Sequence, residues 1–177
     1  MTLLTYSPGK ITELRNQIPL TDTQRTALTQ YSDIKGSPKQ KKQALKQLAN
    51  VSMPCWLEPG LFIAGDGQVR IQKGVFANHN LTILADADIT IGRGVFIGPN
   101  AVLCSYELQT QEITAARRGG ITIEENAWIG ANAVILSGVT IGMGAIVAAG
   151  AVVNQPVPSH SVFMGAPAEF KRWVVAK

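Results

Sequence analysis

A six-residue repeat in the second half of the chain restricts its fold more than any other feature. In ITIEENAWIGANAVILSGVTIGMGAIVAAGAVV, aliphatic residues return at every sixth position, at Ile123, Ile129, Ile135, Ile141, Val147 and Val153. One further position in each hexad is small or β-branched: Ala127, Ala133, Val139, Ala145 and Ala151. An earlier block, IGRGVFIGPNAVL, has the same spacing at Ile91, Ile97 and Leu103. A fixed repeat of this kind indicates a stack of similar units.

A period of six fits neither an amphipathic helix, which repeats every 3.6 residues, nor a simple strand, which alternates every two. It fits a short strand followed by a tight corner, with the aliphatic residue inside a narrow three-sided prism. Gly and Asn crowd the intervening positions because corners need backbone angles that bulky residues resist. From Val69 onward the sequence therefore predicts a mainly β protein, a parallel β-helix built from hexapeptide repeats.

Residues 1–50 follow a different pattern, which is polar and helix-forming. Thr21 with Gln24 three residues later matches a capping box at a helix start. Gly36 and Pro38 mark the turn before the last helix. We therefore expect a helical N-terminal segment at 1–50 that covers an open end of the coil, and a β-helix domain at 51–177. The stretch SYELQTQEITAARRGG interrupts the repeat, so an extended loop is expected at 105–120.

The composition narrows the class of protein. Hydrophobic residues make up 46% of the 177 residues and charged residues 16%, which favours a folded domain over a disordered chain. No apolar run is long enough to span a bilayer, and the N-terminus does not resemble a signal segment, so we expect a soluble, cytoplasmic protein. A net charge of +4 suits anionic ligands but not nucleic acid, which needs clustered basic patches. The two cysteines, Cys55 and Cys104, are expected to be free thiols.

The hexads have the form [Ile/Val/Leu]-Gly-x-x-[Ala/Val]-x, which resembles the left-handed β-helix of the hexapeptide acyltransferases. Within that group, GVFANHNLTILADADITIGRGVFIGPNAVL and NAWIGANAVILSGVTIGMGAIVAAGAVV, with the later GAPAEFKRW, are similar to the sugar O-acetyltransferases of the maltose and galactoside type. The resemblance implies acetyl-CoA as the donor, a hydroxyl of a sugar-like small molecule as the acceptor, and no metal. It also implies a homotrimer with active sites between adjacent subunits.

The resemblance assigns roles to individual positions. Asn78 matches the asparagine that steadies the tetrahedral intermediate, Asp86 matches an acceptor-binding carboxylate, and Arg15 matches an N-terminal arginine that contacts the acceptor. On the donor side, one group of residues falls where the family lines the pantetheine channel: Trp128, Ala131, Ala149 and Asn154. Arg172, with Lys171 beside it, falls where a basic residue meets the nucleotide phosphates.

The sequence departs from the family at the general base. Acyl transfer to an alcohol needs a base for the hydroxyl proton and donors for the developing oxyanion, and asparagine supplies only the second. The family carries its basic histidine near the start of the extended loop, where this chain has Leu108. His79, beside Asn78 at an outward corner position, has a suitable ordinary pKa. Glu107 is a second candidate base, and an exposed corner position without a role is the alternative for His79.

Other candidates have simpler interpretations. His160 is expected in a loop after the last coil, Cys104 as a small half-buried residue, and Arg117 with Arg118 as solvated loop residues. Trp128 is equally compatible with subunit packing. The sequence thus supports an acetyl-CoA-dependent O-acetyltransferase with altered proton transfer. A catalytically silent trimeric β-helix that binds CoA or a partner is the alternative, whereas a carbonic anhydrase on this fold would need three histidines.

Overall fold

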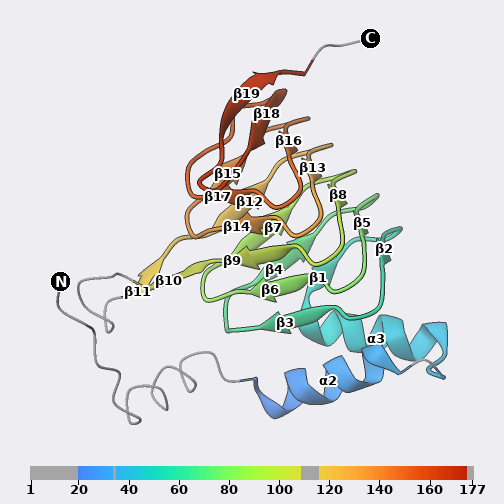
Figure 1. Cartoon of the computed structure of the whole chain (residues 1–177). Helices are drawn as coiled ribbons and strands as arrows, with labels where there is room; N and C mark the ends of the chain where they lie inside the picture. Colours follow the sequence, from blue (N-terminus) through green and yellow to red (C-terminus); the bar gives the residue numbers. More distant parts are fainter. Residues whose placement is uncertain (1–19, 34, 109–115, 175–177) are drawn as a thin grey trace.

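The computed structural model describes residues 20–33, 35–108 and 116–174. From Asn50 the chain winds into a stack of five three-stranded coils whose strands form three parallel sheets (Figure 1). Sheet A contains β1 (Asn50–Val51), β4 (Val69–Ile71), β7 (Ile89–Ile91), β12 (Ile121–Ile123) and β15 (Thr140–Ile141). Sheet C contains β3 (Phe62–Ala64), β6 (Thr82–Leu84), β9 (Val102–Cys104), β14 (Val134–Ile135) and β17 (Val152–Val153). The predicted β-helix is confirmed.

Sheet B is the longest of the three sheets. It contains β2 (Trp56–Leu57), β5 (Phe76–Ala77), β8 (Phe96–Ile97), β13 (Trp128–Ile129), β16 (Ile146–Val147), β18 (Ser161–Met164) and β19 (Glu169–Trp173). The last strand, β19, runs antiparallel to β18. Rings of Phe163, Phe170 and Trp173 contact one another in this final hairpin, at the end of the prism opposite the helices.

The aliphatic repeat forms the core of the prism. All nine aliphatic residues of the two blocks, from Ile91 to Val153, are 0% exposed, and the small residues of the hexads are buried beside them. Complete burial of one such aliphatic side chain contributes roughly 1.5–3 kcal/mol. The coil begins at Asn50, one turn before the repeat that starts at Val69. The sequence repeat obscured this coil because Ile63 and Ile71 are separated by eight residues instead of six.

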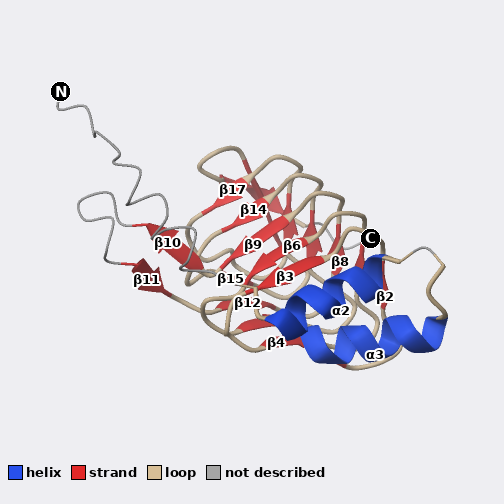
Figure 2. Ribbon diagram, turned by 90° about the horizontal axis from the view of Figure 1, so that it is seen from below, coloured by secondary structure: helices blue, strands red, loops and turns tan. Residues whose placement is uncertain are grey.

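Two helices cover the first coil (Figure 2). Helix α2 (Asp22–Ser32) begins at the predicted capping box, in which Thr21 and Gln24 exchange hydrogen bonds. Helix α3 (Pro38–Leu48) is capped by Ser37 and has Pro38 at its first position. The Tyr31 hydroxyl of α2 donates a hydrogen bond to the Leu57 carbonyl in the first coil. Among the described residues, no helix is long and apolar enough to cross a bilayer.

The interruption of the repeat leaves the coil between sheets C and A. Strands β10 (Tyr106–Leu108) and β11 (Ala116–Arg118) pair antiparallel and project from the prism as a ribbon (Figure 1). The coil then resumes at β12, which pairs in register with β7 of the coil before the interruption. The hexad rhythm can therefore continue across the loop without a shift in the core.

Candidate functional site

The sequence-predicted residues gather at two corners of the prism. We call the corner between sheets B and C the BC corner and the corner between sheets C and A the CA corner. Asn78, His79, Ala131 and Ala149 follow strands of sheet B and lie at the BC corner. Asp86 and Asn154 follow strands of sheet C and lie at the CA corner. The length of a sheet C strand, roughly 15 Å, separates the two corners, so one chain does not bring the two groups together.

Asn78 is held in one orientation by its own chain. It is half-buried directly after β5, and its backbone N–H donates to the Ile97 carbonyl at 2.9 Å. Its side-chain Oδ1 accepts a hydrogen bond from the His79 N–H at 2.7 Å. Because the carbonyl side of the amide is engaged by the backbone, the Nδ2 group is the one left to donate to a ligand. This is the geometry that an oxyanion donor needs.

The BC corner above Asn78 is built from very small residues. Gly98, Gly130 and Ala148 occupy the position of Asn78 in the next coils, as shown by the same backbone hydrogen bond in each. A Cβ at Gly98 would lie 2.6 Å from the Ala131 nitrogen, and one at Gly130 would lie 2.4 Å from the Ala149 nitrogen. Neither glycine can therefore carry a side chain, and the corner stays smooth for three coils above Asn78.

His79 shares this corner with two residues of the predicted donor site. His79, Ala131 and Ala149 occupy equivalent positions in the second, fourth and fifth coils, each one residue before the left-handed corner residue, and Pro99 holds this position in the third coil. His79 is exposed, as expected, and stands one residue from Asn78. The structure therefore brings Asn78, His79, Ala131 and Ala149 to one corner.

Aromatic residues form a row on the outer face of sheet B beside this corner. Phe76 and Phe96 stack with ring centroids 5.0 Å apart, and Phe96 meets Trp128 edge to face at 6.1 Å. Trp128 is 51% exposed. Phe76 and Phe96 were not among the predicted site residues, although Trp56, Phe76 and Phe96 recur every 20 residues, which is one full coil.

Arg172 lies at the far end of the same face. It pairs with Val162 in register, so its side chain follows the outward row that contains Trp128. At about 4.8 Å per strand, Arg172 is roughly 14 Å beyond Trp128 and about 24 Å beyond the level of Asn78. Lys171 is an exposed residue at an irregularity between β18 and β19. The corner and this face thus form a long strip with Asn78 near one end and a cation at the other.

The CA corner holds Asp86 next to the N-terminal helices. Asp86 is only 8% exposed and lines a cleft of about 540 Å³ between this corner and helices α2 and α3. Most of the residues that line the cleft are of polar types, including Gln24, Lys46 and Gln47. Asn154 is exposed at the same corner three coils further along, and so it lies away from Ala131 and Ala149, with which the sequence analysis grouped it.

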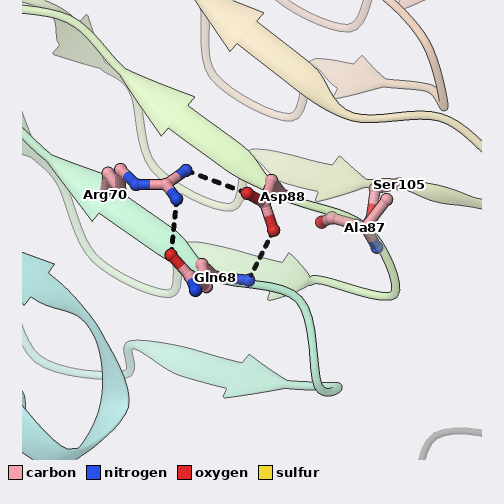
Figure 3. A network of polar contacts seen from close by, with 5 residues as sticks. All are labelled: Gln68, Arg70, Ala87, Asp88 and Ser105. Atoms are coloured by element: carbon pink, nitrogen blue, oxygen red, sulfur yellow. Dashed lines mark hydrogen bonds and ion pairs between the residues drawn. The ribbon is translucent and has the colours of Figure 1, made fainter.

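The turn that contains Asp86 is fixed by charge and by hydrogen bonds. Asp88 accepts a hydrogen bond from the Gln68 N–H at 3.0 Å and forms an ion pair with Arg70 at 2.9 Å (Figure 3). These two contacts, the backbone one first, hold the pKa of Asp88 below its ordinary value. This network could not be predicted from the sequence, because Arg70 and Asp88 are 18 residues apart and come into contact only where adjacent coils stack.

The remaining candidates are placed as follows. His160 is exposed at a corner between sheets A and B with a left-handed φ of 56°, away from His79. Cys104 is half-buried at the loop root, as expected, and its thiol donates to the Tyr106 carbonyl. Arg15 lies outside the described residues, as do the side chains of four loop residues: Glu107, Leu108, Arg117 and Arg118. Among the described residues, no three His, Cys, Asp or Glu side chains form a metal-binding group.

Comparison with known proteins gives matches across the chain. Residues 120–155 match the family model described as bacterial transferase hexapeptide (six repeats). A galactoside O-acetyltransferase of Lactococcus lactis is 32% identical over 144 residues, which cover 76% of this chain and 68% of that protein.

Two solved structures share the fold over nearly the whole chain. A hexapeptide-repeat acetyltransferase of Vibrio cholerae, complexed with acetyl-CoA, is 27% identical with a TM-score of 0.80 and covers 96% of this chain and 92% of its own. A galactoside acetyltransferase in complex with coenzyme A is 27% identical with a TM-score of 0.76, covering 99% and 86%.

Proposed function

The chain belongs to the hexapeptide-repeat acyltransferases of the galactoside O-acetyltransferase type, and from that premise we propose that it transfers an acetyl group from acetyl-CoA to a hydroxyl of a sugar-like acceptor. The observation that carries the proposal is the strip from Asn78 to Arg172. An extended donor with a thioester at one end and phosphates at the other matches a strip that begins with an amide donor and ends with a guanidinium. Guanidinium groups suit phosphates because their donors match phosphate oxygens in pairs.

The small residues of the BC corner support the same assignment. A flexible thioester arm that lies along Gly98, Gly130 and Ala148 can approach the backbone closely, because these positions carry no side chain larger than a methyl group. Trp128 then flanks the arm from the outer face of sheet B. When the hydroxyl attacks the thioester carbonyl, the Asn78 Nδ2 group donates to the oxyanion that develops. The carbon–sulfur bond breaks, and CoA leaves as the thiol.

Proton transfer is assigned to His79 in this proposal. Leu108 has no proton-accepting group, so the base that relatives carry near the loop start must be replaced for the reaction to proceed at a useful rate. His79 is exposed at the same corner as Asn78, and a neutral imidazole carries a ring nitrogen that can accept a proton. It takes the hydroxyl proton as the oxygen attacks, and the thiolate is protonated afterwards.

We further propose that the active form is a homotrimer. Asp86 and Asn154 lie at the CA corner and Asn78 at the BC corner, so a complete site needs the CA corner of one copy beside the BC corner of the next. A closed ring of identical contacts satisfies this for every copy at once. The exposed aromatic row of Trp56, Phe96 and Trp128 supports association, since a contiguous apolar surface of this kind is costly in water.

Two measurements test the function. First, acetyl-CoA is expected to raise the thermal midpoint of the wild-type protein but not of a Trp128→Ala, Arg172→Ala double variant. Second, a panel of monosaccharides and glycosides is screened for CoA thiol release in the wild type, His79→Ala and His160→Ala. Loss of release in the first variant alone supports His79 as the base, and unchanged rates in both remove it.

The competing function is a catalytically silent trimer that binds CoA, which Leu108 favours. It predicts the same thermal shift with acetyl-CoA but no thiol release with any acceptor. The pair of measurements therefore separates the enzyme from the binding protein, and a missing thermal shift contradicts both.

A further inference from the structure

The CA corner is unusual because its turns are longer than the hexad allows in the first three coils. The aliphatic residues on either side of it, Ile63 and Ile71 or Ile83 and Ile91, are eight residues apart, and in the third coil the chain leaves as the loop at 105–120. Residues 65–68 and 85–88 therefore stack directly below the loop root. The second of these turns carries Asp86.

From below, the Asp86 turn is held by the turn of the first coil. The Gly67 N–H donates to the Ala85 carbonyl at 2.7 Å, and Asp88 is fixed by Gln68 and Arg70. The Gln24 side chain of α2 donates to the Gly65 carbonyl at 2.7 Å beneath them. A continuous column of hydrogen bonds thus runs from helix α2 up to the Asp86 turn.

From above, the ends of the turn keep backbone partners: the Ser105 N–H donates to the Leu84 carbonyl and the Ile121 N–H to the Asp88 carbonyl, each at 3.0 Å. Between them, the Ala87 N–H bonds to a side chain, because the chain has left the coil at this point. The Ala87 N–H corresponds to the Gly67 N–H one coil below, and it donates to the Ser105 Oγ at 2.9 Å (Figure 3). The Ser105 hydroxyl lies 3.1 Å from both the Leu84 and Ala87 carbonyl oxygens, to one of which it donates. Ser105 is 0% exposed, so water cannot replace its hydroxyl without rearrangement.

We propose that Ser105 is a positioning residue that holds the Asp86 turn against the loop root and thereby fixes the acceptor-binding carboxylate. The Ser105 hydroxyl contacts the Leu84 carbonyl, two residues before Asp86, and the Ala87 carbonyl, one residue after it, while Asp86 itself lines the cleft. Ser105 is also the first residue of the loop, so the loop and the acceptor carboxylate share one anchor. The inference rests on the proposed function, because it takes Asp86 as the acceptor contact.

The kinetic test compares Ser105→Ala with Ser161→Ala in the full-length protein. Ser161 is also 0% exposed, and its hydroxyl donates to a backbone carbonyl, that of Pro158, at the opposite end of the prism. Ser105→Ala is expected to raise the KM for the acceptor by about tenfold, while the KM for acetyl-CoA changes by less than about twofold. Ser161→Ala is expected to leave the acceptor KM unchanged. Equal effects of the two variants on acceptor KM would contradict the proposal.

A double-mutant cycle with Asp86→Asn separates positioning from general destabilisation. If Ser105 acts through Asp86, the Ser105→Ala effect on acceptor KM disappears in the Asp86→Asn background, because the effects of substitutions within one network are not additive. Fully additive effects would show that Ser105 acts elsewhere. Should Ser105→Ala fail to fold, Ser105→Cys replaces it, since a thiol fills the buried space but forms weaker hydrogen bonds. The same loss of additivity is then expected, with a smaller effect.

Amide hydrogen exchange provides a readout that does not need turnover. Ser105→Ala is expected to speed exchange of the Ala87 N–H by about tenfold or more relative to wild type, because that group loses its acceptor. Ser161→Ala should leave this exchange unchanged. A wild-type protein that releases no thiol with any acceptor contradicts the proposed function, and the exchange result alone then decides whether Ser105 holds the turn. Unchanged exchange at Ala87 would overturn the positioning role.

Discussion

At the scale of single residues, the corners of the coil determine which side chains are allowed. The BC corner carries one left-handed residue in each of the five coils, and the corner between sheets A and B carries one in each turn after the first coil. These residues are Gly or Asn except for His160: Gly60, Gly74, Asn80, Gly94, Asn100, Asn126, Asn132, Gly144 and Gly150. Gly has no Cβ, and Asn tolerates this conformation better than other residues. The residue types at these corner positions are therefore determined mainly by backbone geometry, and the candidate functional residues, such as Asn78 and His79, lie next to them in the chain.

Two glycines with positive φ angles allow the cost of a strained backbone to be measured apart from the cost of a steric clash. Gly65 has φ +104° and a Cβ there would lie 2.2 Å from the Ala85 carbonyl oxygen, whereas Gly150 has φ +70° and open space around it. Gly150→Ala is expected to cost about 1–2 kcal/mol of unfolding free energy. Gly65→Ala should cost clearly more, because the backbone of the Asp86 turn must move. Urea unfolding checks both variants, and equal costs would refute the collision.

Asn78 is expected to act on the rate of the chemical step. Because its Nδ2 donates only to the developing oxyanion in the proposed mechanism, Asn78→Ala should lower kcat by about 10²–10³-fold with little change in the KM for acetyl-CoA. Asn126→Gly, which replaces an exposed asparagine at a different corner, is the matched control and should retain kcat. Steady-state thiol release measures both, and a change confined to KM would argue for ground-state binding.

At the scale of elements, helices and turns are attached to the coil by a small number of contacts. Helix α2 is attached to the first coil by the Tyr31 and Gln24 side chains, and the 85–88 turn by Asp88 and Ser105. These contacts link parts of the chain 18 to 41 residues apart. Removing one of them should loosen an element while the hydrophobic core of the prism stays intact.

The Asp88 contact should depend on pH. Folding lowers the pKa of Asp88 from its ordinary value of 3.8, so the carboxylate stabilises the folded turn above that value and loses this effect as pH falls through the lowered pKa. Wild type should therefore exceed Asp88→Asn in thermal midpoint near pH 6, and the difference should vanish in acid. Thermal melts over this pH range check the prediction, and a difference that grows in acid would have the wrong sign.

The Tyr31 hydroxyl is expected to matter for the attachment of helix α2. Tyr31→Phe removes its hydrogen bond to Leu57 and should cost about 1–2 kcal/mol. Burial raises the pKa of Tyr31 from its ordinary value of 10.0 to about 12, so this contribution should be fully present well below pH 10 and be lost as pH rises from there through the raised value. Thr29→Val, which removes an exposed hydroxyl contact within the same helix, is the control and should cost less than about 0.5 kcal/mol.

At the scale of the whole molecule, the outer faces of sheets A and B differ in character. The outer row of sheet A is polar, with Arg70, Thr90, Thr122 and Thr140 at equivalent positions, whereas that of sheet B is aromatic. Such a difference between the faces of one prism favours association through selected faces over non-specific aggregation. The two corners of the proposed site, the BC corner with Asn78 and the CA corner with Asp86, both lie on the outside of the prism, where a second copy can contact them.

The proposed trimer can be tested on the aromatic row. The wild-type mass in solution is expected to equal three copies of the 18.9-kDa chain. Phe96→Lys places a charge between Phe76 and Trp128 and should shift the protein to single copies, whereas Thr90→Lys on sheet A should leave the assembly intact. Light scattering coupled to size exclusion measures the mass. A wild-type monomer would contradict the trimer.

The sequence alone determined the coil, because a hexad repeat is a local rule. Each Ile, Ala and Gly specifies one side or corner through its own size and backbone preference, and so the core from Ile91 to Val153, the cap at Thr21 and the turn marked by Gly36 and Pro38 could be predicted. The family resemblance added Asn78, Asp86 and Arg172. What only the tertiary structure decided is which of these residues meet. Asn78 and Asp86 are eight residues apart in sequence but lie at different corners, whereas Ser105 and Ala87, 18 residues apart, are in contact. Which residues become neighbours depends on how many residues each coil contains. The hexad repeat does not predict the two extra residues that each of the first two coils has at the CA corner.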